Sequence, residues 1–187
     1  MPLSQGAERE LLHTREITIC GYQRTDGLID IEAQLIDTKS YTFTNEDRGE
    51  IPAGEPLHGM SLRMTVDDRL TIIACEAVTD YGPWAPCPAA AHSFSRLAGL
   101  RIRPGFLKHA LERVAGAEGC THLRELLQQV ATTAYQTMYS VRMRRGVRMD
   151  DKPILLNTCL AYASDSPVVA RRWPELYQPK EATEAAE

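Results

Sequence analysis

The feature that most constrains the fold is an alternation of apolar and polar side chains within residues 28–41. Because successive side chains of a strand point to opposite faces, this alternation predicts a long strand with one apolar and one polar face. A polar loop over residues 45–56 is expected to follow it. The apolar face of the strand carries Ile29, Ile31, Ala33 and Leu35.

Three further segments have the composition of strands, namely residues 13–22, 62–66 and 70–78. A polar turn at Thr25-Asp26-Gly27 joins the first two strands of the chain, and Asp67-Asp68 joins the last two. Such short connections reverse the chain and leave no room for a parallel crossover. The N-terminal half therefore predicts an antiparallel sheet built from hairpins.

The second half of the chain has helical spacing instead. Residues 89–97 and 106–114 form two shorter helical patterns, and the longest pattern begins at Cys120. Its apolar residues recur every three or four positions, as on one face of a helix. A sheet followed by helices predicts an α+β fold, in which the C-terminal helices pack on the antiparallel sheet. The apolar stripe comprises Leu123, Leu126, Leu127, Val130, Ala131, Ala134 and Met138.

At 187 residues, the chain is long enough for one domain with its own core. We expect an N-terminal arm over residues 1–12, a single domain over residues 13–177 and a disordered Ala/Glu-rich tail over residues 178–187. The domain is expected to have three parts along the chain: a sheet (13–80), a helical layer (81–150) and a C-terminal segment (151–177).

The composition argues against several classes of protein. A formal net charge of −4 argues against a general nucleic-acid binder, which is usually basic. No window approaches the roughly 20 apolar residues of a membrane-spanning helix, and residues 1–16 lack the apolar core of a signal peptide. Walker, GxGxxG and GxSxG motifs are absent, so we expect no nucleotide cofactor. We expect neither a nucleic-acid partner nor a membrane partner.

The five cysteines are an odd number and are scattered over strand-like and helix-like segments. In a chain without a secretory signal this indicates reduced thiols, and therefore a cytoplasm of the bacterial type. Cys20 and Cys75 lie in the middle of strands and are interpreted as small buried residues.

The segment Gly119-Cys120-Thr121-His122-Leu123 places a thiol and an imidazole at the start of the longest helix. The helix dipole favours a thiolate there, so we expect Cys120 to be a reactive or metal-binding residue. His58 and Cys87 also lie at the ends of elements, where side chains can meet at one edge of a sheet. One imidazole and two thiolates suit zinc or iron and leave one position open.

We therefore predict a metal site formed by His58, Cys87 and Cys120, with His122 as a further candidate ligand. No CxxC spacing supports this site, so the alternative is that the cysteines are simply small buried residues.

The N-terminal hairpin has a dense polar face. In the simplest interpretation this face is a solvated surface, with ion pairs worth ~0–1 kcal/mol each. In the alternative, it closes over the cysteine edge, where Tyr22, Asp30 and Glu32 act together with Cys120 in catalysis. Four side chains are then expected to bind the substrate, namely Arg24, Lys39, Arg63 and Trp84. The polar face as a whole comprises Tyr22, Arg24, Asp26, Asp30, Glu32, Asp37 and Lys39.

Residues 59–138, with the hairpin that turns at Asp67-Asp68, resemble iron–sulfur scaffold proteins of the NifU/IscU type and their SufE-like relatives. This resemblance implies a NifU/SufE-like core, with Cys87 and Cys120 at the positions of the scaffold's loop and helix cysteines. The scaffold's first hairpin cysteine has no counterpart here, because Pro56-Leu57-His58 stands in its place. The absence of this cysteine counts against a role in the assembly of iron–sulfur clusters.

A second resemblance covers nearly the whole chain. The Gly119–Leu123 segment and three parts of the hairpin are similar to a bacterial family described only as a domain of unknown function. The three parts are Gly21-Tyr22-Gln23-Arg24-Thr25-Asp26-Gly27, Asp30-Ile31-Glu32-Ala33 and Asp37-Thr38-Lys39.

We expect a small-molecule enzyme of bacterial aromatic catabolism, a lyase or isomerase whose hairpin carboxylates move protons beside a metal or beside an activated Cys120. Its substrate is expected to be aromatic or to carry a carboxylate. The first alternative is a sulfur or iron–sulfur carrier, with Cys120 as the acceptor thiol. The second is a structural zinc protein, with His122 or Cys159 as the fourth ligand. The oligomeric state is left open, a homodimer included.

Overall fold

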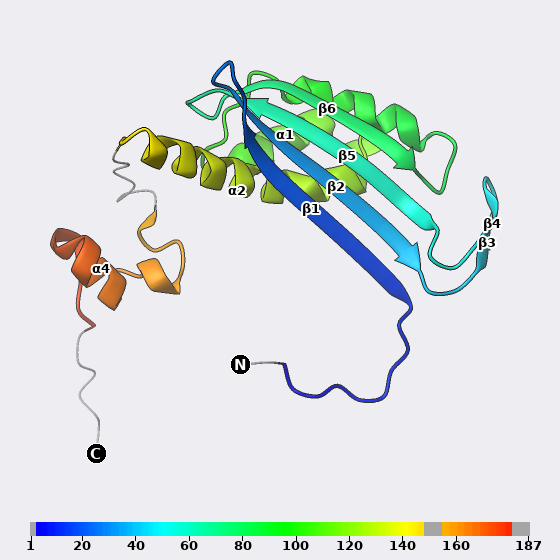
Figure 1. The fold of residues 1–187 in the computed structure, drawn as a ribbon, viewed down its shortest axis with the longest axis horizontal. Coiled ribbons are helices and arrows are strands. Elements are labelled where there is room, and N and C mark those ends of the chain that lie inside the picture. The colour runs from blue at the N-terminus through cyan, green and yellow to red at the C-terminus, as the bar shows by residue number, and fades with distance from the viewer. Residues whose placement is uncertain (1–2, 148–154, 181–187) are drawn as a thin grey trace. The chain divides into compact units, whose positions relative to one another are not determined.

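The computed structural model describes residues 3–147 and 155–180 (Figure 1). The chain divides into two compact units, Met1–Arg144 and Arg145–Glu187. The sheet and the longest helix both belong to the first unit. The part of the expected tail after residue 180 lies outside the described residues.

The sheet has one apolar face, as the alternation along the chain predicts. Ile29, Ile31 and Leu35 are each at most 1% exposed, whereas Gln34 between them is exposed. All neighbouring strands are antiparallel, which confirms the prediction from the short turns. The strands lie in the order β1 (His13–Gln23), β2 (Ile29–Lys39), β5 (Pro56–Val66) and β6 (Ile72–Tyr81).

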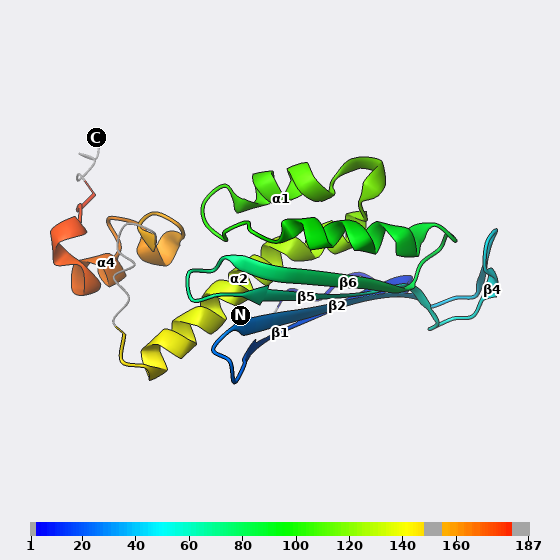
Figure 2. The same cartoon turned by 90° about the horizontal axis from the view of Figure 1, so that it is seen from above.

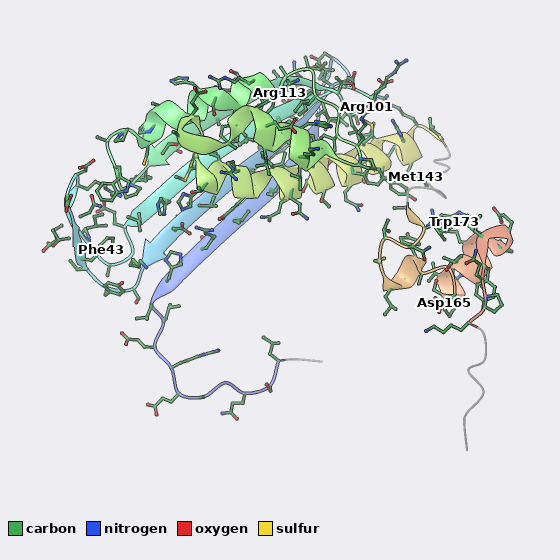
Figure 3. All side chains as sticks on the ribbon, turned by 180° about the vertical axis from the view of Figure 1, so that it is seen from behind. Phe43, Arg101, Arg113, Met143, Asp165 and Trp173 are labelled. Atoms are coloured by element: carbon green, nitrogen blue, oxygen red, sulfur yellow. The ribbon has the colours of Figure 1, made fainter. Side chains whose placement is uncertain are left out.

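Helices cover this apolar face of the sheet, and in the described part of the unit the opposite face lies open (Figure 2). The predicted α+β fold is therefore confirmed. Arg113, labelled in Figure 3, links two of these helical elements. Its Nη1 donates to the backbone oxygens of Arg96 and Ala98 at 2.7 and 2.9 Å. The helical elements are η1 (Cys87–Leu97), α1 (Phe106–Val114), η2 (Gly116–Glu118) and α2 (Thr121–Arg144).

The segment predicted as a helix over residues 89–97 forms 3₁₀ turns from Cys87 to Leu97 instead of an α-helix. Pro86 precedes these turns and Pro88 is their second residue, and neither can donate a backbone hydrogen bond. Phe94 and Leu97 are nonetheless fully buried, so the segment still contributes its apolar side to the core.

Helix α2 packs directly on the backbone of the edge strand β1. A Cβ atom placed on Gly21 would lie 1.9 Å from Oγ1 of Thr137, so no larger residue fits here without a shift. The absence of a side chain at Gly21 thus allows the helix to cross the sheet at short distance.

A short hairpin, formed by β3 (Phe43–Asn45) and β4 (Gly49–Ile51), overlaps the polar loop predicted for residues 45–56. Three residues per strand are too few for alternation to be visible in the sequence. Ile51 is 1% exposed and anchors the hairpin, while the side chain of Phe43 is half-buried (Figure 3).

The second unit is small and contains η3 (Leu160–Tyr162), α4 (Pro167–Arg172) and η4 (Pro174–Leu176). Ser166 caps α4, because its Oγ accepts a hydrogen bond from the backbone N–H of Val169. Trp173 stacks on Tyr162 with ring centroids 5.6 Å apart, and it is 5% exposed. Among the helices of the described residues, none is long and apolar enough to cross a membrane.

Two neighbouring isoleucines of β6 provide a matched test of this layer arrangement. Ile72, on the face that the helices cover, is 1% exposed, whereas Ile73, on the opposite face, is 51% exposed. Ile72→Ala should lower the free energy of unfolding by about 2–5 kcal/mol, because it leaves a cavity in the core. Ile73→Ala should change it by less than about 1 kcal/mol. Urea denaturation of both variants measures the difference, and equal effects would contradict the assignment of the two faces.

Candidate functional site

A carboxylate and two imidazoles meet at the end of the sheet where β2 finishes and β5 begins. Asp37, His58 and His122 each offer a ligand-type atom, and these atoms all lie within 4.8 Å of one another. Asp37 is paired with His58 across the two strands, and His122 is the second residue of α2. We call these three residues the Asp–His–His cluster.

The position of Asp37 follows from the alternation of side chains between the two faces of β2. It lies two residues after Leu35, on the face of β2 that carries Ile29 and Ile31, and it is 0% exposed. The alternation that builds the core therefore also turns this carboxylate toward the helices.

The buried negative charge of Asp37 is compensated by an arginine. Nε and Nη2 of Arg15, on β1, donate to the two carboxylate oxygens of Asp37 at 2.7 Å each. His58 Nδ1 lies 3.0 Å from Oδ2, and His13 Nε2 lies 3.3 Å from Oδ1. A buried carboxylate with a bidentate arginine is fixed in both charge and orientation.

These contacts decide the charge of each group. Burial raises the pKa of Asp37, but the hydrogen bonds and charges of Arg15 and His58 outweigh burial and lower that pKa to about 2. Burial is also the main reason why the pKa values of His58 and His122 are lowered. At neutral pH the cluster thus contains one carboxylate anion and two neutral imidazoles.

The neutral state of His58 has a defined tautomer. Because Asp37 is ionised and can only accept, Nδ1 of His58 carries the proton and donates it to the carboxylate. Nε2 of His58 then keeps its lone pair. The ring of His58 lies against that of His122, with centroids 3.8 Å apart and planes tilted by 32°.

Arg15 also connects the cluster to the rim of the site. Its Nη1 donates to Oε2 of Glu125, one turn after His122 on α2. The pKa of Arg15 is raised, first by its hydrogen bond to Asp37 and also by the charge of Glu125. Arg15 therefore joins β1, β2 and α2 at one point.

The structure brings together part of the predicted metal site. His58 and His122 are close, but in the part of the chain that the structure describes neither Cys87 nor Cys120 belongs to a group of three clustered ligands. The backbone oxygen of Cys120 accepts the first hydrogen bond of α2, from Arg124 N, and its side chain packs partly against the core. Cys87 is half-buried at the start of η1.

Asp37, the carboxylate at the centre of the cluster, was not predicted as a site residue. The sequence pattern placed it on the polar face of the hairpin, whereas the structure buries it on the apolar face. A signal was present, because Asp37 continues the parity of Ile29 to Leu35 and an acid on an apolar strand face needs a partner. Arg15 points to the same face of the sheet from β1, but nothing in the sequence around it indicates that it pairs with a buried acid.

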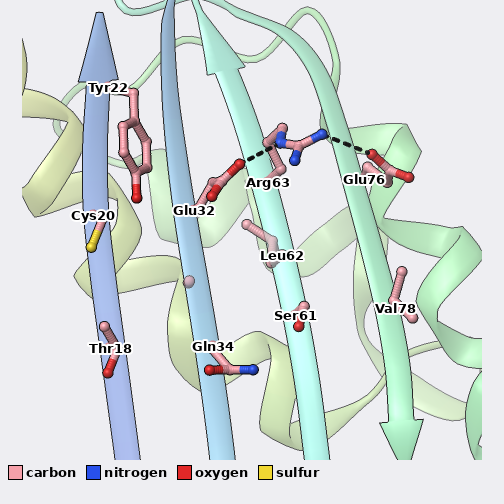
Figure 4. A pocket seen from close by; sticks show the side chains of 11 residues that line it. Thr18, Cys20, Tyr22, Glu32, Gln34, Ser61, Leu62, Arg63, Glu76 and Val78 are labelled. Atoms are coloured by element: carbon pink, nitrogen blue, oxygen red, sulfur yellow. Dashed lines mark hydrogen bonds and ion pairs between the residues drawn. The ribbon is translucent and has the colours of Figure 1, made fainter.

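Several of the other predicted site residues lie on the opposite face of the sheet. Tyr22, Glu32 and Arg63 line an open pocket of about 460 Å³ there (Figure 4). Arg63 lies between Glu32, at 2.8 Å, and Glu76, at 3.7 Å. Cys20, expected to be buried, is exposed at this pocket, whereas Cys75 is buried as expected. Alternation therefore separates these groups from the Asp–His–His cluster by the thickness of the sheet.

The remaining predicted residues lie at the ends of strands or in the loops that follow them. Arg24 pairs with Asp26 in the turn after β1 and with Asp30, whose carboxylate also accepts a hydrogen bond from Thr65. Lys39 ends β2, with its Nζ 6.0 Å from the ring of Tyr41. Trp84 is 48% exposed in the loop between β6 and η1.

A family model described as "Protein of unknown function (DUF2889)" matches residues 13–136. This range begins at His13 and includes the whole Asp–His–His cluster and Arg15. Comparison with curated proteins and with solved structures gives no match. The resemblance to iron–sulfur scaffold proteins therefore remains a prediction.

The low pKa of Asp37 predicts a specific dependence of stability on pH. A shift from 3.8 to about 2 stabilises the folded state by about 2 kcal/mol above pH 5, and about half of that is lost by pH 3. Asp37→Asn should therefore destabilise the protein at pH 7, and its difference from the wild type should shrink as the pH falls. Denaturant unfolding between pH 7 and pH 3 measures this, with the exposed Asp68→Asn as control. A constant difference would contradict the assignment.

Proposed function

The chain belongs to the family described as "Protein of unknown function (DUF2889)", and from the cluster within the matched range we propose that it is a small-molecule enzyme with a metal centre at Asp37, His58 and His122. The observation that carries this proposal is the convergence of the three ligand-type groups within 4.8 Å. This ligand set replaces the two cysteines of the sequence prediction with a carboxylate and a second imidazole.

The charge state of the cluster supports the proposal. Two neutral imidazoles and one ionised carboxylate are the groups that zinc and ferrous iron accept as ligands, and three protein ligands leave positions open for water or substrate. Arg15 uses one lone pair on each oxygen of Asp37, and His58 Nδ1 and His13 Nε2 lie at hydrogen-bond distance from Oδ2 and Oδ1. A metal ion on Asp37 would therefore take the place of the His58 contact, and His58 would stay neutral by carrying its proton on Nε2 instead of Nδ1. Arg15 would hold the carboxylate in place from the second coordination shell.

A lyase or isomerase reaction suits this site best. A bound metal ion would polarise a substrate oxygen as a Lewis acid. Groups at the rim of the cluster would then transfer the protons, because Asp30 and Glu32 lie on the other face of the sheet. Two rim groups carry suitable side chains: His13, 3.3 Å from Asp37, and Glu125, which is 54% exposed.

An aromatic substrate remains part of the proposal through Trp84. The loop that carries Trp84 follows β6 at the end of the sheet where β5 begins, which is also the end that holds His58. Arg63, the other predicted substrate residue on the sheet, would not take part, because it lies in the open pocket.

The sulfur or iron–sulfur carrier remains the second candidate, in line with the resemblance to NifU-type scaffolds. It depends on Cys120, which is partly exposed at the N-terminus of α2. A cytoplasmic location is proposed with either function, because all five cysteines are free thiols.

Metal content tests the proposal directly. Untagged protein purified without chelators should contain about one zinc or iron per chain by elemental mass spectrometry. His58→Ala and His122→Ala should each lose most of it, whereas the exposed His109→Ala and the cysteine variant Cys120→Ser should keep it. Loss in Cys120→Ser but not in His122→Ala would restore the cysteine site. Metal-free wild type that also fails to bind added zinc or cobalt would overturn the proposed centre.

A further inference from the structure

The strand that carries His58 is irregular just before that residue. Asp37 is paired with His58, but the next residue of β2, Thr38, is paired with Pro56. Leu57 is therefore an extra residue, and the ladder is interrupted by a β-bulge at the Asp–His–His cluster. A bulge changes the direction of the following side chain and leaves backbone groups outside the ladder, so it needs other partners.

Arg48 supplies those partners from the β3–β4 hairpin. Its Nη1 donates to the backbone oxygens of Pro56 and Leu57, at 2.9 and 3.4 Å. Its Nη2 donates to Oε1 of Glu55 at 2.5 Å, and its guanidinium carbon lies 5.9 Å from the centre of the Tyr81 ring. The side chain of Arg48 is 20% exposed. One guanidinium thus contacts every residue from Glu55 to Leu57, directly before His58.

The hairpin presents Arg48 in a fixed orientation. Oδ1 of Asn45 accepts hydrogen bonds from the backbone N–H groups of Asp47 and Arg48, at 3.0 and 3.1 Å. Gly49 follows with φ +71°, which closes the three-residue turn. Oδ2 of Asp47 in turn accepts a hydrogen bond from the backbone N–H of Ala85 at 2.7 Å, which ties the turn to the loop after β6. The turn is therefore fixed by hydrogen bonds of Asn45 within the hairpin and of Asp47 to the loop after β6.

We infer that Arg48 is the positioning residue of His58: it fixes the bulge at Pro56 and Leu57, and so aims the imidazole at Asp37 and His122. Its planar fork can reach two carbonyls and a carboxylate at once, which a lysine ammonium on a flexible chain cannot reproduce. As far as metal binding is concerned, this inference rests on the proposed function. The orientation of His58 can be measured without any metal.

The first measurement therefore uses metal-free protein. The His58 Nδ1 proton, held between the ring and Asp37, should give a downfield imidazole N–H signal in the proton NMR spectrum. Asp37→Asn identifies the signal by removing its anionic acceptor. Arg48→Ala and Arg48→Lys should both lose or broaden the signal, while Arg103→Ala, which changes an exposed arginine before α1, should keep it. Thermal unfolding and circular dichroism show whether each variant is folded.

The second measurement is the affinity of the same variants for cobalt or zinc. Arg48→Ala should bind about tenfold more weakly than the wild type, the usual loss for a residue that orients a ligand, and Arg103→Ala should bind unchanged. An intact His58 signal in a folded Arg48→Ala variant would overturn the inference. If the signal disappears but neither wild type nor variant binds metal, the proposed function fails and the positioning role stands. If Arg48→Ala does not fold, Arg48→Lys decides.

Discussion

The structure around the candidate site depends on the burial of one charge. Asp37 is 0% exposed, and an isolated carboxylate at such a position would be strongly unfavourable. Arg15 removes that penalty with two hydrogen bonds, and it reaches Glu125 on α2 with its third donor group. Because Arg15 lies on β1 and Asp37 on β2, this ion pair fixes the edge strand, the neighbouring strand and the helix relative to one another.

The same burial determines what the histidines can do. His58 and His122 lose solvent when α2 covers the end of the sheet, and their pKa values fall because burial disfavours the charged ring. The carboxylate meanwhile stays ionised, since Arg15 stabilises its charge. Neutral imidazoles beside a fixed anion would bind a metal ion with no net loss of protons, since His58 needs only to carry its proton on Nε2 instead of Nδ1. This readiness, more than the number of ligands, favours a metal centre over a solvated ion pair.

Strand parity separates the two polar regions of the protein. Residues of one parity build the core and end in the Asp–His–His cluster, and residues of the other parity form the open pocket around Glu32, Arg63 and Glu76. The hairpin carboxylates considered as proton-transfer groups therefore belong to a different surface from His58. Any reaction at the cluster would therefore have to use groups on the side of the sheet that the helices cover.

The sequence by itself determined the four long strands, their antiparallel pairing, helices α1 and α2 and the position of Cys120 at the start of α2, but neither the β3–β4 hairpin nor the 3₁₀ turns of η1. These features depend on periodicity and turn length, which are local. It also placed His58 and His122 at the ends of elements, but it could not reveal that Asp37 and Arg15 complete their surroundings. Those contacts span 22 residues between Arg15 and Asp37 and 110 between Arg15 and Glu125. The register of the β1–β2 hairpin pairs Arg15 with Asp37. Only the packing of α2 on the sheet brought His122 and Glu125 to this pair, because a buried charge selects its partner in space and leaves no fixed spacing along the chain.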